Sequence, residues 1–266
     1  MAVRLSAAML LAAGVAGCAA LGVPMSLGDG DRTEKAEELM RQAREVEESD
    51  RDTALVLYHQ AITVSGSSPV AYLRLGDAYT RMHRVKEAVG AYRKAVAGDP
   101  DNAEAQLGLG TALVRQGEVK EGIVALEKAA PVVATGTAYN RLGVAQTMAG
   151  EFSQAQESYE RGLSVAPEDI DIATNLAIAA ALGEDTEKAG KVAAQIAVSP
   201  GATAVHRRNL VIVYGIIGRT SEEARAVAPG DLKPTEFSKL FDRAAAIRKI
   251  TDPAKRAQAV GTIQGG

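Results

Sequence analysis

Residues 69–100 read PVAYLRLGDAYTRMHRVKEAVGAYRKAVAGDP, and they set the architecture of the chain. Their apolar and small residues recur at helical spacing in two runs, which are separated by a polar break and closed by Pro100. The positions that mark the two runs are Tyr72, Leu75, Gly76, Tyr79, Ala88, Tyr92 and Ala95. This spacing predicts two helices that meet face to face.

The residue types at these positions have a physical reason. Gly76 and Ala88 are small where the helices must approach closely, and the aromatic rings of Tyr79 and Tyr92 can fill the space beside them. Pro100 cannot continue the second helix, because it lacks a backbone donor. A single helical hairpin cannot bury its apolar face alone, so further copies should follow.

The pattern recurs along the chain. Leu75-Gly76 is followed by Leu109-Gly110 and Leu142-Gly143, at intervals of 34 and 33 residues, and an earlier, weaker copy has Arg41-Gln42 instead. The marked positions resemble the tetratricopeptide repeat, which is about 34 residues long. This resemblance implies an all-α fold, namely a right-handed superhelical array of about five to six hairpins over residues 32–218 with a C-terminal capping helix.

Charge and composition exclude some classes of partner. The 266 residues include 30 basic and 33 acidic side chains, for a formal net charge of −3. Nucleic-acid-binding proteins usually carry a basic excess, so no nucleic acid is expected. The same balance argues against broad adhesion of the protein surface to anionic membranes. Periodic segments cover most of the chain, which favours one helical domain over two compact ones.

No group of residues indicates catalysis or metal binding. His59, His83 and His206 are scattered, without a neighbouring Cys or a second His at helical spacing. Gly108-Leu109-Gly110 follows no strand, so it does not indicate a dinucleotide site. No serine lies in a nucleophile elbow. We therefore predict a protein that is not an enzyme, with no catalytic residue, metal or cofactor.

The N-terminus predicts a lipid anchor. Residues 1–17 hold a positive charge and then an apolar run of secretory-signal length, which is short for a membrane span. The run ends in Val-Ala-Gly-Cys18, which resembles a bacterial lipobox with Cys18 as the lipidated residue. An ordinary signal peptide with an accidental cysteine and an uncleaved anchor are the alternatives. Ala19 favours the outer membrane, by resemblance to lipoprotein sorting in enterobacteria. Gly-rich residues 18–31 predict a flexible tether.

Residues 31–49 predict an amphipathic helix with a strongly acidic side. Its glutamates are expected to form one solvated face rather than a metal or partner site. They are Glu34, Glu37, Glu38, Glu45, Glu47 and Glu48.

The repeat resemblance also implies a groove. In tetratricopeptide arrays the first helix of each hairpin lines a concave wall, and these positions mix apolar with hydrogen-bonding side chains. Such a lining suits an extended or helical peptide segment better than a terminal carboxylate. The alternative is that several of them only pack against the neighbouring repeat. The candidate groove residues are Leu73, Asp77, Arg81, Leu107, Thr111, Arg115, Asn140, Val144, Met148, Thr174, Ile178 and Leu182.

Residues 219–266 depart from the repeat. Apolar residues recur at helical spacing from Thr235 to Ile250, and Pro234 suits the start of that helix. Asp252-Pro253 can begin a second short helix through Ala259. Because a helical array needs a terminal element with a polar outer face, this segment predicts a cap, with a partner-docking tail as the alternative.

The C-terminal third carries a more specific resemblance. Its segments 209–215 (NLVIVYG) and 252–259 (DPAKRAQA) resemble the TadD lipoprotein family of the tight-adherence (Flp pilus) system. That resemblance implies an outer-membrane lipoprotein that faces the periplasm and helps secretin assembly as a pilotin-like factor. The expected partner is a protein or peptide segment in the groove, such as secretin or another pilus-assembly component. A general envelope-assembly or peptidoglycan-hydrolase adaptor is the first alternative, and an enzyme with an unrecognised site is the second.

Overall fold

All regular structure in the described part of the chain is helical. The computed structural model describes residues 28–230 and 232–264, with the backbone alone at 29, 263 and 264. The predicted signal peptide, Cys18 and most of the predicted tether lie outside these residues. The helices are α1 (Asp29–Val46), α2 (Arg51–Val64), α3 (Pro69–Arg81), α4 (Val85–Gly98), α5 (Ala103–Gln116), α6 (Val119–Val133), α7 (Gly136–Ala149), α8 (Phe152–Val165), α9 (Ile170–Leu182), α10 (Thr186–Ala197), α11 (Ala204–Ile216), α12 (Ser221–Ala226), α13 (Pro234–Ile247) and α14 (Pro253–Gln264).

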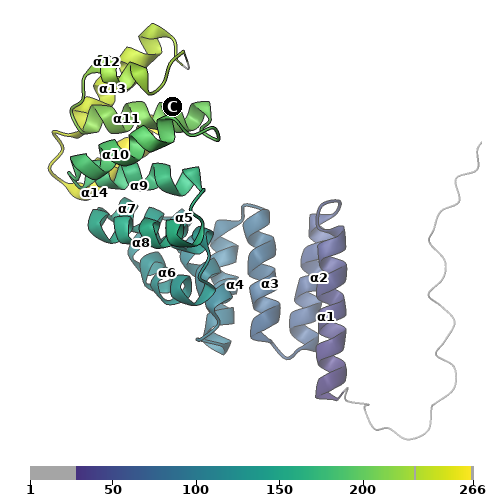
Figure 1. Ribbon diagram of the computed structural model, residues 1–266. Helices are drawn as coiled ribbons and strands as arrows, with labels where there is room; N and C mark the ends of the chain where they lie inside the picture. Colours follow the sequence, from purple (N-terminus) through teal and green to yellow (C-terminus); the bar gives the residue numbers. More distant parts are fainter. Residues whose placement is uncertain (1–27, 231, 265–266) are drawn as a thin grey trace, which may run out of the picture.

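Consecutive helices pack in antiparallel pairs from α1–α2 to α9–α10, and the pairs stack into an elongated, curved array (Figure 1). The predicted all-α array of helical hairpins is confirmed. At its C-terminal end, α11 packs mainly against α13, because α12 is only one and a half turns long. The buried side of α13 holds Phe237, Leu240, Ala244 and Ile247, while its outer side is polar, as a cap requires.

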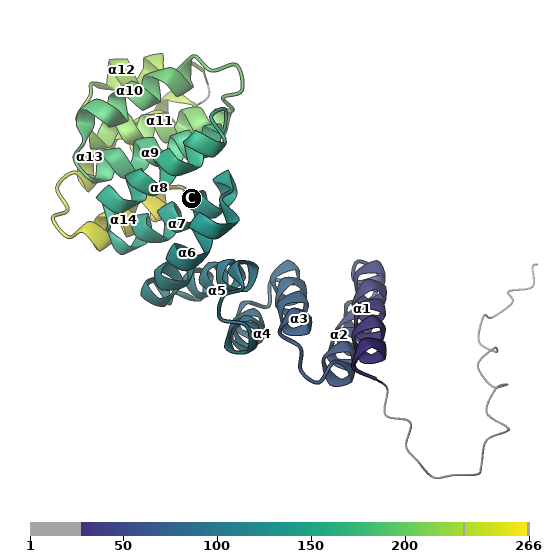
Figure 2. The same cartoon turned by 60° about the horizontal axis from the view of Figure 1, so that its bottom comes forward.

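The curvature of the array places the first helices of the hairpins on the inside. The helices α3, α5, α7 and α9 contact one another in succession, whereas no comparable contact joins α4, α6 and α8 (Figure 2). Stacked units approach most closely on the concave side of a curved stack. The odd-numbered helices therefore line the concave face, as the repeat register predicts.

Glycines and tyrosines fit together between the helices. A Cβ atom on Gly76 would lie 2.6 Å from two ring carbons of Tyr92, and one on Gly108, in the next repeat, would lie 2.5 Å from the same ring. Gly143 meets the ring of Tyr159 in the same way, at 2.6 Å. The predicted close approach at Gly76 is confirmed.

Local signals explain most helix boundaries. The side chain of Asn102 accepts a hydrogen bond from the Ala105 amide at the start of α5, and Gly117 ends that helix with a φ of 94°. Two boundaries differ from the expectation. The first helix begins at Asp29, inside the predicted tether, and α14 continues to Gln264 rather than ending at Ala259.

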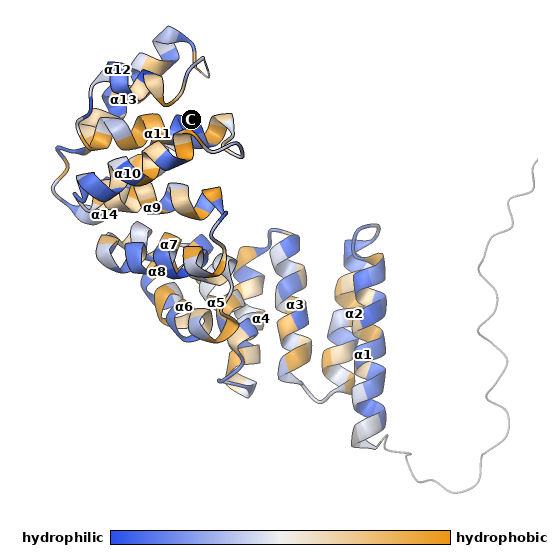
Figure 3. Cartoon of the chain, in the orientation of Figure 1, coloured by the Kyte–Doolittle hydropathy of each residue, from blue (hydrophilic) through white to orange (hydrophobic). Residues whose placement is uncertain are grey.

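Hydropathy follows the position of each helix in the array. The terminal helix α1 is mostly blue in Figure 3, whereas α11, which has neighbours on several sides, carries broad orange segments. An end helix of a stack keeps a solvent-facing side, and α1 supplies it at the N-terminal end.

The same substitution at two glycines of one hairpin is expected to have opposite effects. Gly76→Ala should lower the free energy of unfolding by about 1–3 kcal/mol, because its methyl group overlaps the Tyr92 ring. Gly90→Ala should raise it by about 0.5–1 kcal/mol, because Gly90 is exposed within α4 and no other group lies within 4 Å of the new methyl. Urea denaturation of the two variants checks the pair, and equal effects would refute the proposed packing.

Candidate functional site

The candidate groove residues all lie on the concave helices α3, α5, α7 and α9, and many of them gather at two hollows. The first hollow, between α3 and α5, is lined by Leu73, Asp77, Arg81 and Leu107. The second, between α7, α9 and α14, is lined by Val144, Met148, Ile178 and Leu182. These are the α3–α5 hollow and the α7–α9 hollow.

The α3–α5 hollow has a volume of about 290 Å³ and a polar floor. The Tyr92 hydroxyl donates a hydrogen bond to Asp77 at 2.9 Å, and Arg74 donates to the same carboxylate at 3.1 Å. Burial raises the pKa of the Tyr92 phenol, so this hydroxyl remains a neutral donor at physiological pH. Glu104 and Arg141 complete the polar rim.

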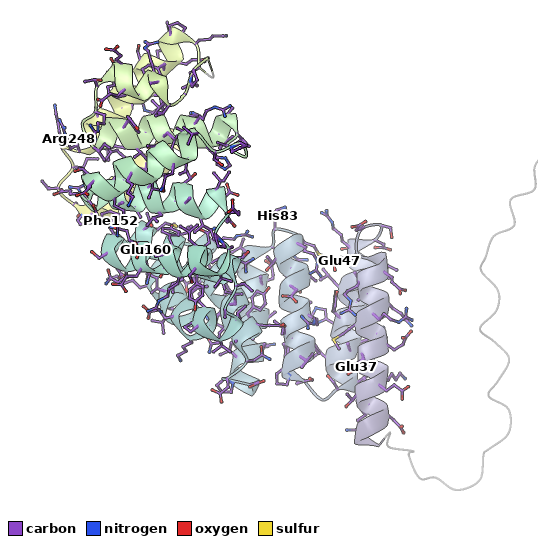
Figure 4. The ribbon with its side chains drawn as sticks, viewed as in Figure 1. Glu37, Glu47, His83, Phe152, Glu160 and Arg248 are labelled. Atoms are coloured by element: carbon purple, nitrogen blue, oxygen red, sulfur yellow. The ribbon has the colours of Figure 1, made fainter. Side chains whose placement is uncertain are left out.

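Arg81 is already engaged within the chain. Its guanidinium donates hydrogen bonds of 2.6 and 2.7 Å to the two carboxylate oxygens of Glu47, which lies between the first two hairpins (Figure 4). The Tyr58 hydroxyl donates to the same carboxylate at 3.2 Å. The predicted solvated acidic face is therefore wrong for Glu47, which is 8% exposed. The Arg81 hydrogen bonds lower the pKa of Glu47 despite this burial.

The α7–α9 hollow is larger, about 760 Å³, and mainly apolar. Met148 is 46% exposed at its margin, whereas Ile178 and Leu182 are buried. The hydroxyls of Thr147 and Tyr159 lie 3.2 Å apart at its wall, and Thr147 also donates to the Gly143 carbonyl at 2.8 Å. This hollow can accept apolar side chains, because its lining is mainly apolar.

The other candidate residues lie outside both hollows. Thr111 donates to the Leu107 carbonyl at 2.7 Å, and Arg115 is exposed. Asn140 accepts a hydrogen bond of 3.0 Å from Asn175 on α9, and Thr174 is 2% exposed. Asn140 and Thr174 thus pack between repeats, which was the alternative interpretation for such positions.

Sequence reasoning missed one repeated element of the groove. The hydroxyls of Thr80 and Tyr92 lie 3.1 Å apart in the α3–α5 hollow, as those of Thr147 and Tyr159 do in the other. The signal was present, because each threonine follows the repeat glycine by four residues and each tyrosine by sixteen. Arg141 and the α14 side of the groove were also missed.

The described ranges hold neither a metal-binding cluster nor a membrane-spanning helix. Residues 28–230 and 232–264 hold no group of three or more His, Cys, Asp or Glu side chains placed to bind a metal. None of the helices described is long and apolar enough to cross a membrane.

Known structures share this architecture. PilF of Pseudomonas aeruginosa matches with a TM-score of 0.59 at 20% identity, covering 78% of this chain and 98% of that one. MamA of Desulfovibrio magneticus matches with a TM-score of 0.56 at 18% identity, covering 61% and 93%. YrrB, a tetratricopeptide repeat protein with an unusual peptide-binding site, matches with a TM-score of 0.57 at 17% identity, covering 73% and 98%. At sequence identities this low, the three matches support the fold and not a shared function.

Of the two sequence comparisons, the one with protein-family models agrees with the fold. No curated protein sequence matches the chain significantly. The tetratricopeptide repeat family model matches residues 73–140 and 140–203, which hold the α3–α5 hollow and the α7 and α9 walls of the other hollow. Such repeats typically serve as protein-binding scaffolds rather than catalysts. Residues 73–203 are thus similar to the tetratricopeptide repeat family.

Proposed function

We propose that the chain is a protein-binding scaffold whose concave groove holds an extended or helical segment of a partner. The observation that carries this proposal is the pair of hollows on successive concave helices, each lined by four of the candidate groove residues. YrrB, a structural neighbour, is a repeat protein with a peptide-binding site. Concave, mainly apolar clefts with a few placed polar groups are typical ligand sites.

The chemistry of the two hollows specifies the segment further. In the α3–α5 hollow, Asp77 and Arg81 are satisfied by neighbours within the chain, so Arg81 and the exposed Arg141 do not form a pair of free cations that could clamp a terminal carboxylate. The α7–α9 hollow is larger and apolar. The partner segment is therefore internal and amphipathic, with apolar side chains that enter the second hollow.

The proposed setting is the bacterial envelope. Cys18 anchors the chain to the outer membrane through a lipid, and the repeats face the periplasm. There they bind secretin or another assembly component of the Flp pilus, as a pilotin-like factor. The lipobox and the resemblance of the segments 209–215 and 252–259 to TadD lipoproteins support this setting.

A groove variant with a matched control tests the proposal. Arg141→Glu with Met148→Glu places two acidic groups on the concave side, where both parent side chains are exposed. Val124→Glu with Lys128→Glu makes the same changes at exposed positions of α6, on the convex side. Affinity purification from the native host should recover secretin or pilus-assembly proteins with the convex variant and lose at least nine-tenths of them, about tenfold, with the concave one.

The same cells test where the chain is located and which of the alternative functions it has. Cys18→Ala should move the chain from the membrane fraction to the soluble fraction. Unchanged membrane association of this variant would contradict the lipid anchor. Recovery of barrel-assembly proteins or peptidoglycan hydrolases in place of pilus components would contradict the pilus setting and favour the general adaptor.

A further inference from the structure

The last helix of the chain returns to the groove. Although α13 covers the end of the array, α14 packs against α7 and α9, which end 104 and 71 residues before α14 begins (Figure 2). It forms one wall of the α7–α9 hollow, where it supplies Ala257, Val260 and Gly261. A helix in this position is not needed to close the stack, because α13 already does so.

One arginine fixes the position of α14. The Arg256 guanidinium donates to the carbonyl of Leu182, the last residue of α9, at 2.6 Å, and to the Ile250 carbonyl at 2.9 Å. It also lies 3.0 Å from a carboxylate oxygen of Glu184. The final carbonyls of a helix lack partners within the helix and carry a partial negative charge, so a cation there is favourable. Arg256 is only 9% exposed.

The N-terminal turn of α14 makes the second contact. A Cβ atom on Gly150, which ends α7 with a φ of 83°, would lie 2.7 Å from the Cβ of Pro253. Only a residue without a side chain admits α14 at this distance. Val260, one turn beyond Arg256, is 4% exposed and completes the buried side.

The contact of α14 with α7 and α9 is otherwise small. Among the described side chains of α14, only Arg256 and Val260 are buried, and a hollow of about 760 Å³ remains between the helix and the groove. A twelve-residue helix is marginal in water by itself, so α14 depends on its packing against α7, α9 and α13 to stay folded. The short connection after α13 keeps it close to the groove even when it is undocked.

We propose that α14 is a built-in occupant of the partner groove, and that a partner helix binds at α7 and α9 by displacing it. This inference rests on the proposed function. It names the class of partner segment: a short helix with alanine-sized residues facing the groove and one arginine that reaches the end of α9. The free chain therefore keeps α14 in place as one wall of the apolar α7–α9 hollow until a competing helix arrives.

A peptide with the sequence of residues 250–264 tests the occupancy without any foreign partner. The labelled peptide is titrated into the full wild-type chain and into the full chain carrying Arg256→Ala and Val260→Asp, which undocks α14. An attached helix competes at an effective concentration of the order of millimolar, so the undocked chain should bind the peptide at least about tenfold more tightly. A peptide carrying the same two substitutions should not bind.

Three further full-length variants make the result specific. Lys249→Ala removes an exposed basic residue of the connection before α14, outside the hollow, and should bind the peptide as weakly as the wild-type chain. Arg256→Ala alone should bind the peptide with an affinity between those of the wild-type and undocked chains. If the double variant unfolds at a lower urea concentration than the wild-type chain, Arg256→Ala takes its place in the titration. Met148→Glu, added to the undocked chain, should abolish peptide binding.

Failure of the peptide to bind the undocked chain, or equal affinity for the wild-type and undocked chains, would overturn the inference. The peptide titration can fail independently of the affinity purification that tests the proposed function. Peptide binding without recovery of any partner would remove the proposed function and leave α14 as the groove's occupant. Recovery of a partner through the groove, without peptide binding, would do the reverse.

Discussion

The Tyr159→Ala chain is expected to lose about 3–5 kcal/mol of unfolding free energy. The Tyr159 ring is 1% exposed and fills the space that Gly143 leaves between α7 and α8. Removing it opens a cavity that neither helix can close, because each is held by the next repeat. Urea denaturation followed by circular dichroism measures the loss, and hydrogen exchange should show the earliest opening in α7 and α8.

Tyr159→Phe is the matched control. It keeps the ring and removes only the hydroxyl that lies 3.2 Å from Thr147, whose own hydroxyl still donates to the Gly143 carbonyl. The expected cost is about 1 kcal/mol. A Phe variant as unstable as the Ala variant would mean that the hydroxyl contact, and not the fit of ring to glycine, holds this hairpin together.

The hairpins were predictable because their signals are local. The contact of Gly76 with Tyr92 joins residues sixteen positions apart within one hairpin, and the spacing of both is fixed by the helical period. The same register identified the concave helices and hence the positions facing the groove. Where the copy departs from the pattern, at Arg41-Gln42, the helix still forms, since Ala36, Met40 and Ala43 keep one face buried.

The placement of α14 could not be predicted from the sequence. Its anchor joins Arg256 to the Leu182 carbonyl, 74 residues away, and that distance depends on the curvature accumulated over the intervening repeats. The local pattern predicted a helix starting at Asp252-Pro253, which is confirmed. Nothing in that pattern distinguishes a helix that covers the end of the array from one that returns to the groove.

The sequence also could not predict which groove positions are open to a partner and which are covered by the next repeat. The register places Asn140 and Val144 on the same side of α7, yet Asn140 bonds to Asn175 while Val144 lines a hollow. Which position is covered depends on the side chain that the next repeat presents. For the same reason the glutamate that Arg81 of the second hairpin binds is Glu47, which directly follows α1, and not one of the glutamates within that helix.

Glu47 links the first two hairpins through an ion pair that depends on pH. Both oxygens of its carboxylate accept hydrogen bonds from Arg81, and Tyr58 adds a third. Burial and the adjacent carboxylate raise the pKa of Tyr58 to about 12, so the phenol stays protonated and acts as a donor throughout the acidic and neutral range. The stabilisation therefore depends on the charge of Glu47 alone.

Glu47→Gln is expected to lower the unfolding free energy by about 1.5–3 kcal/mol at neutral pH, the range for hydrogen bonds to charged groups. Because the folded chain lowers the pKa of Glu47, its stabilisation is complete above the unfolded-state pKa of about 4.3 and is lost as the pH falls through the folded-state value. Urea denaturation from neutral pH to about pH 3 should thus show the wild-type and Gln chains converging in acid. Glu48→Gln, at the exposed neighbouring position, should follow the wild-type curve throughout. A constant gap between the wild-type and Gln chains across this range would show that packing of the side chain, and not its charge, joins the two hairpins.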